Sequence, residues 1–354
     1  METKPLLTSE EFTRLANNFY VGRGLDNQLF RINIDAELMN YILTNVETVK
    51  KKFKVALCYI CLNAPYWEYA KPMIEGSKKF FLPGHNVDHL FWTDMPHPDN
   101  KESFEKAEKH LLDLYISQGI SGDLPALAKV AVERARESAK LTYEGTVFPT
   151  ESVAWPLPTL MRYSLFLQQE EKLKDYDYIF YCDIDMLFVN VVGDEILGDG
   201  LTAAQHPMYA LDKRMWMPFE PNEKSTAYVK RPGQLINDGG QPRFMPLYYA
   251  GGLQGGKSDI FIKAMKVMKK NIEQDFNKNY VAIWNDESHW NKYLSDNPPI
   301  VVLTPSYIYP DSLHKEYYIP RWGMDYVPKL VTLTKKHSLR KLTAEEQAQL
   351  TKMQ

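Results

Sequence analysis

The sequence predicts an α/β protein with a parallel sheet, and three observations support this fold class. Strand-like and helix-like segments alternate after residue 54, an order typical of parallel sheets covered by helices. A long apolar and aromatic segment, residues 176–189, has the content of a buried strand. Hydrophobic residues make up 44% of the 354 residues and charged residues 25%, which is a globular composition. We therefore expect one large folded domain with helical additions.

The helices and strands are expected in a defined order. The first 50 residues are predicted to form a helical extension, because Thr8 and Glu11 have capping-box spacing ahead of an apolar stripe. Residues 51–328 hold the main domain, and residues 329–354 form a basic tail. The first half of the main domain is expected to contain strand 55–62, a helix around 66–80, strand 89–94 and a two-helix insertion at about 101–142. One face of the insertion carries the apolar residues Leu127, Val130, Ala131 and Ala135. The second half is expected to contain helix 160–173, strand 176–189, a glycine-dense turn 251–256, helices starting at Ser258 and about Asp286, and strand 300–303.

Charge and apolar runs exclude several function classes. The 42 Lys and Arg against 45 Asp and Glu give a net charge of −3, which does not suit a duplex-binding protein, so we expect no nucleic-acid partner. The longest apolar run, residues 55–62, is far shorter than the ~20 residues that span a bilayer. Acidic residues near the start argue against a signal or transit peptide. We therefore expect no transmembrane segment and a cytoplasmic location.

Three cysteines are an odd number, and none has a partner at zinc-binding spacing. Cys58 and Cys61 lie three apart in a predicted strand, so they point to opposite faces. We expect buried thiols, which suit a reducing compartment.

Two aspartates, Asp183 and Asp185, end the predicted strand 176–189 and are expected to face the same side. Paired carboxylates suit Mg²⁺ or Mn²⁺, whose remaining coordination positions a substrate diphosphate can fill. One alternative is a strand end whose acids pair with Lys or Arg. Another is a haloacid-dehalogenase-like phosphatase, but its motif has Thr at the fifth position, where this chain has Leu187.

A second candidate site is the segment 284–289, in which Trp284 precedes the acids Asp286 and Glu287. Aromatic faces beside carboxylates are common where sugars bind. Helix capping by Asn285 or Asp286, with Glu287 in the first turn, explains the same residues without any ligand. The basic tail carries enough charge to close over a phosphate, or it is a solvated face.

Taken together, these motifs resemble glycosyltransferase family 6, whose members include the histo-blood-group A and B transferases and the α-1,3-galactosyltransferases. The resemblance runs from about residue 54 to 341. Its carriers are Tyr66, segment 81–85, segment 92–94, Arg162, the Asp183 and Asp185 motif, His206, Tyr228, the glycine-rich segment 248–256, segment 286–294 and segment 305–307.

The resemblance implies a GT-A type nucleotide-binding sandwich for residues 51–328 and a retaining α-1,3 transfer of N-acetylgalactosamine or galactose from a UDP-sugar to a galactose-terminated acceptor. Asp183 and Asp185 match the Mn²⁺ ligands (Mg²⁺ is the alternative ion), and Glu287 matches the candidate nucleophile. His206 and Trp284 match acceptor contacts. The positions that match donor contacts are Tyr66 (stacked on uracil), Arg162, Asp183, Ala250, Gly251, Gly252, Asp286, Lys335, Arg340 and Lys341.

The chain also departs from the family pattern. The insertion at 101–142 is longer than the animal enzymes lead us to expect, and the usual amino-terminal anchor is absent, so we expect a bacterial or phage-type member. Many bacterial members carry asparagines at the metal positions, whereas this chain keeps Asp183 and Asp185. Pro310 stands where the blood-group enzymes have an acid that contacts fucose.

Two functions follow, an active transferase or a catalytically silent sugar-binding protein on the same fold. The presence of both aspartates with Glu287 and Arg162 favours the enzyme. Ala250 and Gly252 align with the positions that separate the two donors in the blood-group pair, and Gly252 matches the form that uses UDP-N-acetylgalactosamine.

Overall fold

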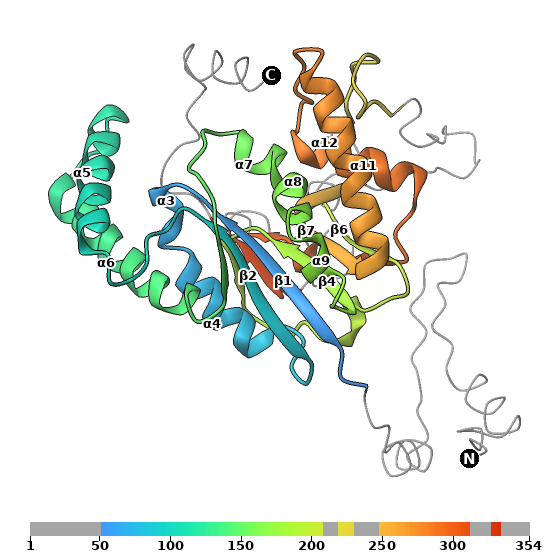
Figure 1. The fold of residues 1–354 in the computed structure, drawn as a ribbon, viewed down its shortest axis with the longest axis horizontal. Helices are drawn as coiled ribbons and strands as arrows, with labels where there is room; N and C mark the ends of the chain where they lie inside the picture. Colours follow the sequence, from blue (N-terminus) through green and yellow to red (C-terminus); the bar gives the residue numbers. More distant parts are fainter. Residues whose placement is uncertain (1–50, 208–218, 230–247, 312–326, 334–354) are drawn as a thin grey trace, which may run out of the picture. The chain divides into compact units, whose positions relative to one another are not determined.

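A computed structural model describes residues 51–207, 219–229, 248–311 and 327–333 (Figure 1). The chain divides into two units, residues 1–51 and 52–354, and only the second is described below. The predicted helical extension at 1–50 therefore lies outside the described residues. No described helix has both the length and the apolar character needed to cross a bilayer.

A seven-stranded sheet forms the centre of the second unit, in the order β3-β2-β1-β4-β7-β6-β8. Strands β1 to β4 are parallel neighbours, and β8 is parallel to β6, but β7 runs antiparallel to both β4 and β6. The expectation of a parallel sheet is thus wrong at β7, and the sheet is mixed. The strands are β1 Lys54–Cys61, β2 Asn86–Thr93, β3 Thr146–Pro149, β4 Tyr178–Cys182, β6 Leu201–Gln205, β7 Tyr249–Lys257 and β8 Val301–Leu303.

The glycine-dense segment 251–256 is part of strand β7, so the predicted turn is wrong. A Cβ atom on Gly255 would lie 2.4 Å from the carbonyl oxygen of Ile179, and one on Gly256 would lie 2.2 Å from that of Gly200. Neighbouring backbones therefore occupy the space of a side chain. Glycine is needed here for close approach between strands.

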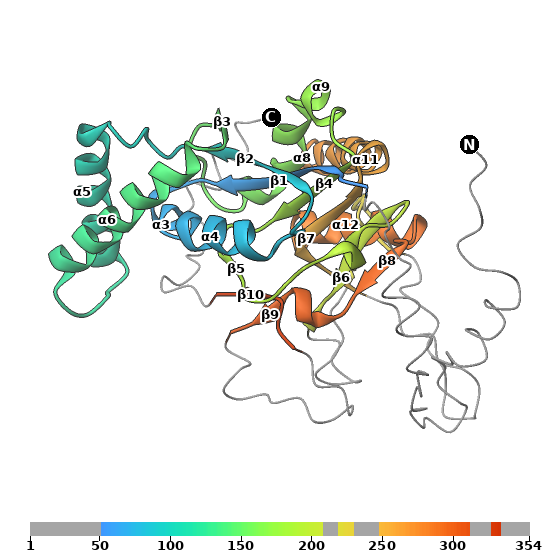
Figure 2. The same cartoon turned by 90° about the horizontal axis from the view of Figure 1, so that it is seen from below.

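Helices cover both faces of the sheet. Figure 2 shows α4 below the strands and α8, α9 and α11 above them. The predicted stripe on α11 is confirmed, because Phe261, Met265, Met268 and Ile272 are all buried. The helices are α3 Ala64–Trp67, α4 Ala70–Phe80, α5 Lys101–Ser117, α6 Leu124–Thr142, α7 Leu157–Leu160, α8 Arg162–Leu167, α9 Glu170–Leu173, α11 Ser258–Phe276 and α12 Asp286–Asp296, with 3-10 turns at Asp194–Ile196 and Pro305–Tyr307.

Each face of β1 packs into its own apolar cluster, as strand alternation requires. Cys61 lies in one cluster and Cys58 in the other, and all three cysteines are free and buried. The prediction of inert thiols on opposite faces is confirmed. Burial also raises the pKa of the Cys61 thiol well above its usual value.

The predicted insertion consists of α5 and α6, which begin at side-chain caps from Asn100 and Asp123. Because β2 and β3 are parallel neighbours, the chain needs a crossover between them, and α6 belongs to that crossover. The apolar face predicted for α6 is wrong in part. Leu127 and Val130 are each 44% exposed, whereas small side chains such as Ala135 are buried, because α6 packs closely against α4.

The predicted strand 176–189 is interrupted. Its second half, β5 (Met186–Phe188), joins a separate sheet of order β5-β10-β9, with β9 at Tyr309–Pro310 and β10 at Leu330–Thr332. Asp183 and Asp185 lie in the turn between β4 and β5. The apolar content indicated burial correctly, but it did not indicate that the chain changes sheets.

Strand β10 also moves the expected boundary of the basic tail. Leu330 is fully buried, and the Lys329 ammonium lies 2.5 Å from Glu195, so residues 329–333 belong to the folded body. Leu330 pairs with Phe188 of β5, and the rest of the predicted tail, residues 334–354, lies outside the described residues.

Substitution of Gly256 by alanine is expected to cost about 3 kcal/mol or more of unfolding free energy, because the new Cβ meets backbone atoms that cannot rotate away. Gly84→Ala is the matched control. Gly84 also has a positive φ, of 105°, but no atom lies within 4 Å of an added Cβ, so only about 1 kcal/mol of backbone strain is expected. Urea denaturation of both variants measures the difference, and equal losses would contradict the close-approach explanation.

Candidate active site

Arg162, the first residue of α8, joins three separate segments of the site. Its guanidinium Nη1 lies 2.6 Å from Asp286 Oδ2 and donates to the Gly251 carbonyl oxygen at 3.0 Å. Its Nη2 lies 3.3 Å from Asp183 Oδ1. The side chain is only 3% exposed, so the start of α12, strand β7 and the turn after β4 meet around one buried charge.

The charges around Arg162 are mutually stabilising. Burial alone would lower the pKa of Arg162, but Asp286, Tyr181 and Asp183 outweigh burial and raise it. Burial raises the pKa of Asp286 to about 6, and the guanidinium opposes this shift. Both groups are therefore charged at neutral pH. Removing either partner would leave an uncompensated buried charge.

A cavity of about 110 Å³ lies in front of Arg162. Three residues expected to contact the donor line it, namely Tyr66, Arg162 and Asp183, and so does the predicted metal ligand Asp185. The structure thus brings together residues from three parts of the sequence. The two aspartates do face one space, although they do so through a turn and not through the strand alternation that we expected.

Two carboxylates that could bind a divalent cation, those of Asp183 and Asp185, line this cavity. Asp183 is about one-third exposed, and Asp185 is 5% exposed, with its carbonyl accepting from the Leu333 N–H. In the part of the chain that the structure describes, no group of three or more His, Cys, Asp or Glu side chains could hold a metal ion. Two carboxylates fit an ion that takes its other ligands from water and a diphosphate.

Glu287 lies in the first turn of α12 and is not among the residues that line this cavity. The Gly251 N–H donates to its Oε2 at 2.6 Å. Burial raises the pKa of Glu287 to about 7, although the Gly251 N–H and the Tyr248 hydroxyl favour the carboxylate. Glu287 is therefore a carboxyl group with a pKa near neutrality, which is typical of catalytic acids and bases.

The capping explanation for segment 284–289 is confirmed in position only, because Asn285 is the N-cap residue and Asp286 and Glu287 lie in the first turn of α12. The Asn285 side chain makes no capping hydrogen bond, and its backbone has a positive φ of 52°. Ser288 Oγ instead accepts from the Trp284 N–H. Asp286 and Glu287 also contact Arg162 and the Gly251 N–H, so their place in the first turn is not their whole role.

Strand β7 leaves room for the side chains of Glu287 and Asp183, because glycines stand where these side chains approach it. A Cβ on Gly251 would lie 3.1 Å from Glu287 Cβ, and a Cβ on Gly252 would lie 2.8 Å from Asp183 Oδ2 and 2.9 Å from Ile308 Cδ1. The preceding Ala250 is buried. The glycines therefore let both carboxylates lie against the strand backbone.

The predicted acceptor residues do not line the cavity. His206 follows β6, and burial lowers its pKa to about 4, so its imidazole is neutral at pH 7. Trp284 precedes α12 and is 39% exposed. The predicted phosphate contacts Lys335, Arg340 and Lys341 lie outside the described residues.

Sequence reasoning missed three side chains that hold the site together. Asn291 accepts from the Tyr249 N–H and donates to the Tyr249 carbonyl, both at 2.8 Å, which fastens α12 to β7. Gln254 donates to the Gly251 carbonyl at 3.0 Å. Tyr181 donates a hydroxyl hydrogen bond to Asp183 Oδ1. Strand alternation was the available signal for Tyr181, which is two residues from Asp183.

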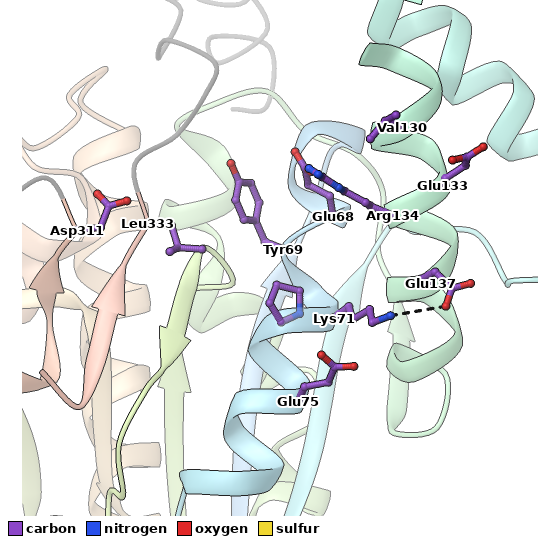
Figure 3. A pocket seen from close by; sticks show the side chains of 11 residues that line it. Glu68, Tyr69, Lys71, Glu75, Val130, Glu133, Arg134, Glu137, Asp311 and Leu333 are labelled. Atoms are coloured by element: carbon purple, nitrogen blue, oxygen red, sulfur yellow. Dashed lines mark hydrogen bonds and ion pairs between the residues drawn. The ribbon is translucent and has the colours of Figure 1, made fainter. Parts of the chain in front are cut away.

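A larger cavity, of about 780 Å³, lies between α4, α6 and the ends of β9 and β10 (Figure 3). Its cations are already paired with its acids, since Arg134 lies 3.0 Å from Glu68 and Lys71 lies 3.7 Å from Glu137. It contains none of the predicted catalytic or metal residues. We therefore place the candidate active site at Arg162 and not in the larger cavity.

The glycosyltransferase family 6 profile matches residues 159–333, which include Arg162, both cavity aspartates, β7 and the start of α12. The chain belongs to glycosyltransferase family 6. The mixed sheet with helices on both faces is the GT-A type fold of this family. The resemblance predicted from the motifs is thereby confirmed, and so is the fold class.

Relatives of this family member come from animals and bacteria. The chain is 33% identical to globoside alpha-1,3-N-acetylgalactosaminyltransferase 1 of Gallus gallus over 246 residues, 70% of this chain and 59% of the relative. It is 26% identical to histo-blood group ABO system transferase 1 of Rattus norvegicus over 275 residues, 76% and 66%. It is 28% identical to O-antigen biosynthesis glycosyltransferase WbnI of Escherichia coli over 166 residues, 47% and 66%. The matches thus cover about three-fifths to two-thirds of these relatives.

Glu287→Gln is expected to stabilise the protein at alkaline pH. Because the folded-state pKa is raised from 4.5 to about 7, ionisation of Glu287 costs stability as the pH rises through this window. The full cost is at most about 3 kcal/mol, so the variant should gain roughly 2 kcal/mol more at pH 8 than at pH 5.

Urea denaturation at the two pH values measures this difference. Glu102→Gln is the control, because Lys106 lowers the pKa of Glu102 and no alkaline gain is expected. A gain at Glu287 that is equal at both pH values would show that burial does not raise its pKa.

Proposed function

We propose that this protein is a retaining α-1,3-glycosyltransferase that moves N-acetylgalactosamine or galactose from a UDP-sugar to a galactose-terminated acceptor. The observation that carries the proposal is the buried Arg162, which links the two-aspartate cavity to Asp286 directly and to Glu287 through Gly251. A donor sugar diphosphate needs both parts, one to hold the diphosphate and one to act at the anomeric carbon. Family membership and the names of the relatives support the same reaction class.

The nucleotide end of the donor is assigned to the cavity. Tyr66 is partly exposed at its wall and offers an aromatic face for uracil. Asp183 and Asp185 would hold Mn²⁺, or Mg²⁺, which would neutralise charge on the departing diphosphate. The basic residues Lys335, Arg340 and Lys341 are proposed to contact the same phosphates.

Glu287 is proposed as the group that makes retention possible. Retention requires a carboxylate on the face of the sugar opposite the leaving group, or a front-side route. The Gly251 N–H and the Tyr248 hydroxyl orient Glu287, and Asp286 is held for a donor-sugar contact by Arg162. With a pKa of about 7, Glu287 is partly ionised at neutral pH, so activity should rise with pH through this value.

The acceptor is proposed to contact His206 and Trp284. A neutral His206 can accept or donate a hydrogen bond to a sugar hydroxyl, and the exposed Trp284 offers an apolar ring face. Both properties suit a galactoside.

The test is to measure UDP release from UDP-N-acetylgalactosamine, UDP-galactose and their gluco epimers, with and without lactose or fucosyl-lactose. Acceptor-dependent release with the two galacto donors is expected in Mn²⁺ and not in EDTA. Glu287→Gln should lower kcat by roughly 10² or more. UDP-sugar binding without acceptor-dependent release would favour a silent sugar-binding protein, and full turnover in EDTA would contradict the metal assignment.

Donor choice is proposed to favour N-acetylgalactosamine, because Gly252 leaves space that an alanine methyl would fill. Gly252→Ala should therefore shift the ratio of kcat/KM for the two donors toward UDP-galactose, by roughly 10 to 200-fold. The added Cβ would also press on Asp183 Oδ2, at 2.8 Å. UDP affinity in Mn²⁺ is the control, since an equal loss for UDP and both donors would mean that the substitution acts through Asp183 and not through the acetamido group.

A further inference from the structure

Tyr181 touches both members of the contact between Arg162 and Asp183. Its hydroxyl donates to Asp183 Oδ1, and the Arg162 guanidinium lies over its ring, 3.7 Å from the centroid. The side chain is 3% exposed and lines the 110 Å³ cavity. Because its ring contacts the guanidinium and its hydroxyl contacts the carboxylate, Tyr181 can set the relative orientation of Arg162 and Asp183.

The geometry answers a problem created by a buried arginine beside a metal-binding carboxylate. A guanidinium can bind both oxygens of one carboxylate through parallel hydrogen bonds, and such a pair would leave Asp183 little capacity for a cation. In this structure, the short contact of Arg162 goes to Asp286, at 2.6 Å, and its contact with Asp183 is a single one at 3.3 Å.

Both contacts on Asp183 fall on the same oxygen, Oδ1. The other oxygen, Oδ2, lies on the side of Gly252, where an added Cβ would be 2.8 Å away. The hydroxyl of Tyr181 therefore fixes the rotation of this carboxylate so that Oδ2 is turned away from the guanidinium.

We propose that Tyr181 is a positioning residue that keeps Asp183 available to a divalent cation. Its hydroxyl holds Oδ1, and its ring holds the Arg162 guanidinium where the short ion pair forms with Asp286. This inference rests on the proposed function, because it concerns the Mn²⁺ or Mg²⁺ on which that function depends.

The test is Tyr181→Phe, which removes the hydroxyl and keeps the buried ring. Binding of Mn²⁺ to the protein with UDP is followed by the loss of the electron paramagnetic resonance signal of free Mn²⁺. A hydrogen bond to a charged group contributes enough for an effect of about tenfold, so Mn²⁺ affinity should fall by about that factor. The value of kcat at saturating Mn²⁺ should change less than the affinity.

Tyr176→Phe is the matched control. It removes another buried tyrosine hydroxyl that donates to a carboxylate, Asp88 Oδ2 at 2.9 Å, at a position that does not line the cavity. This variant should bind Mn²⁺ like the wild type, and thermal denaturation should show that both variants remain folded.

The outcomes separate the two proposals. Equal Mn²⁺ affinity in wild type and Tyr181→Phe, or an equal loss in Tyr181→Phe and Tyr176→Phe, would overturn the positioning role. Failure of the wild-type protein itself to bind Mn²⁺ with UDP would instead contradict the metal assignment in the proposed function.

Discussion

The buried guanidinium of Arg162 is the interaction on which the site depends. Charged groups leave water only when they are paired, and Arg162 finds its partners on segments that are far apart in the sequence. Its short ion pair with Asp286 therefore holds the start of α12 near α8, and its hydrogen bond to the Gly251 carbonyl holds strand β7 beside the same guanidinium. Positions of groups around the cavity follow from satisfying this one charge.

Close packing against a strand without side chains is the second constraint. Asp183 and Glu287 approach the same backbone because Gly251 and Gly252 offer no Cβ atoms. Burial raises the pKa of Glu287, the nearby acids Asp286 and Asp183 add to this shift, and ionisation of Glu287 therefore destabilises the folded protein. The arrangement is thus more suited to binding a charged ligand than to stability, a trade-off common at functional sites.

Local patterns predicted much of the fold, and non-local contacts explain what they missed. The apolar run of β1 and the apolar stripe of α11 are properties of single elements, so the sequence revealed them. The glycines of β7 allow the backbones of neighbouring strands to approach closely, and the chain changes sheets after β4. Both features depend on other segments of the chain, so the local sequence did not predict them. In the site, motifs indicated Asp183, Asp185 and Glu287. The ion pair of Arg162 with Asp286 and the hydrogen bond from Tyr181 to Asp183 are apparent only in the folded structure.

The four glycines of β7 differ in what surrounds them, and this sets where the strand can change during evolution. Around Gly255 and Gly256, the nearest atoms are main-chain oxygens, which cannot yield without disrupting the sheet. Around Gly251 and Gly252, the nearest atoms are Glu287 Cβ and Asp183 Oδ2, and the second of these lies at the end of a side chain that can rotate. Substitutions at Gly251 and Gly252 would therefore alter the surroundings of the Glu287 and Asp183 carboxylates, whereas substitutions at Gly255 and Gly256 would disrupt the sheet itself.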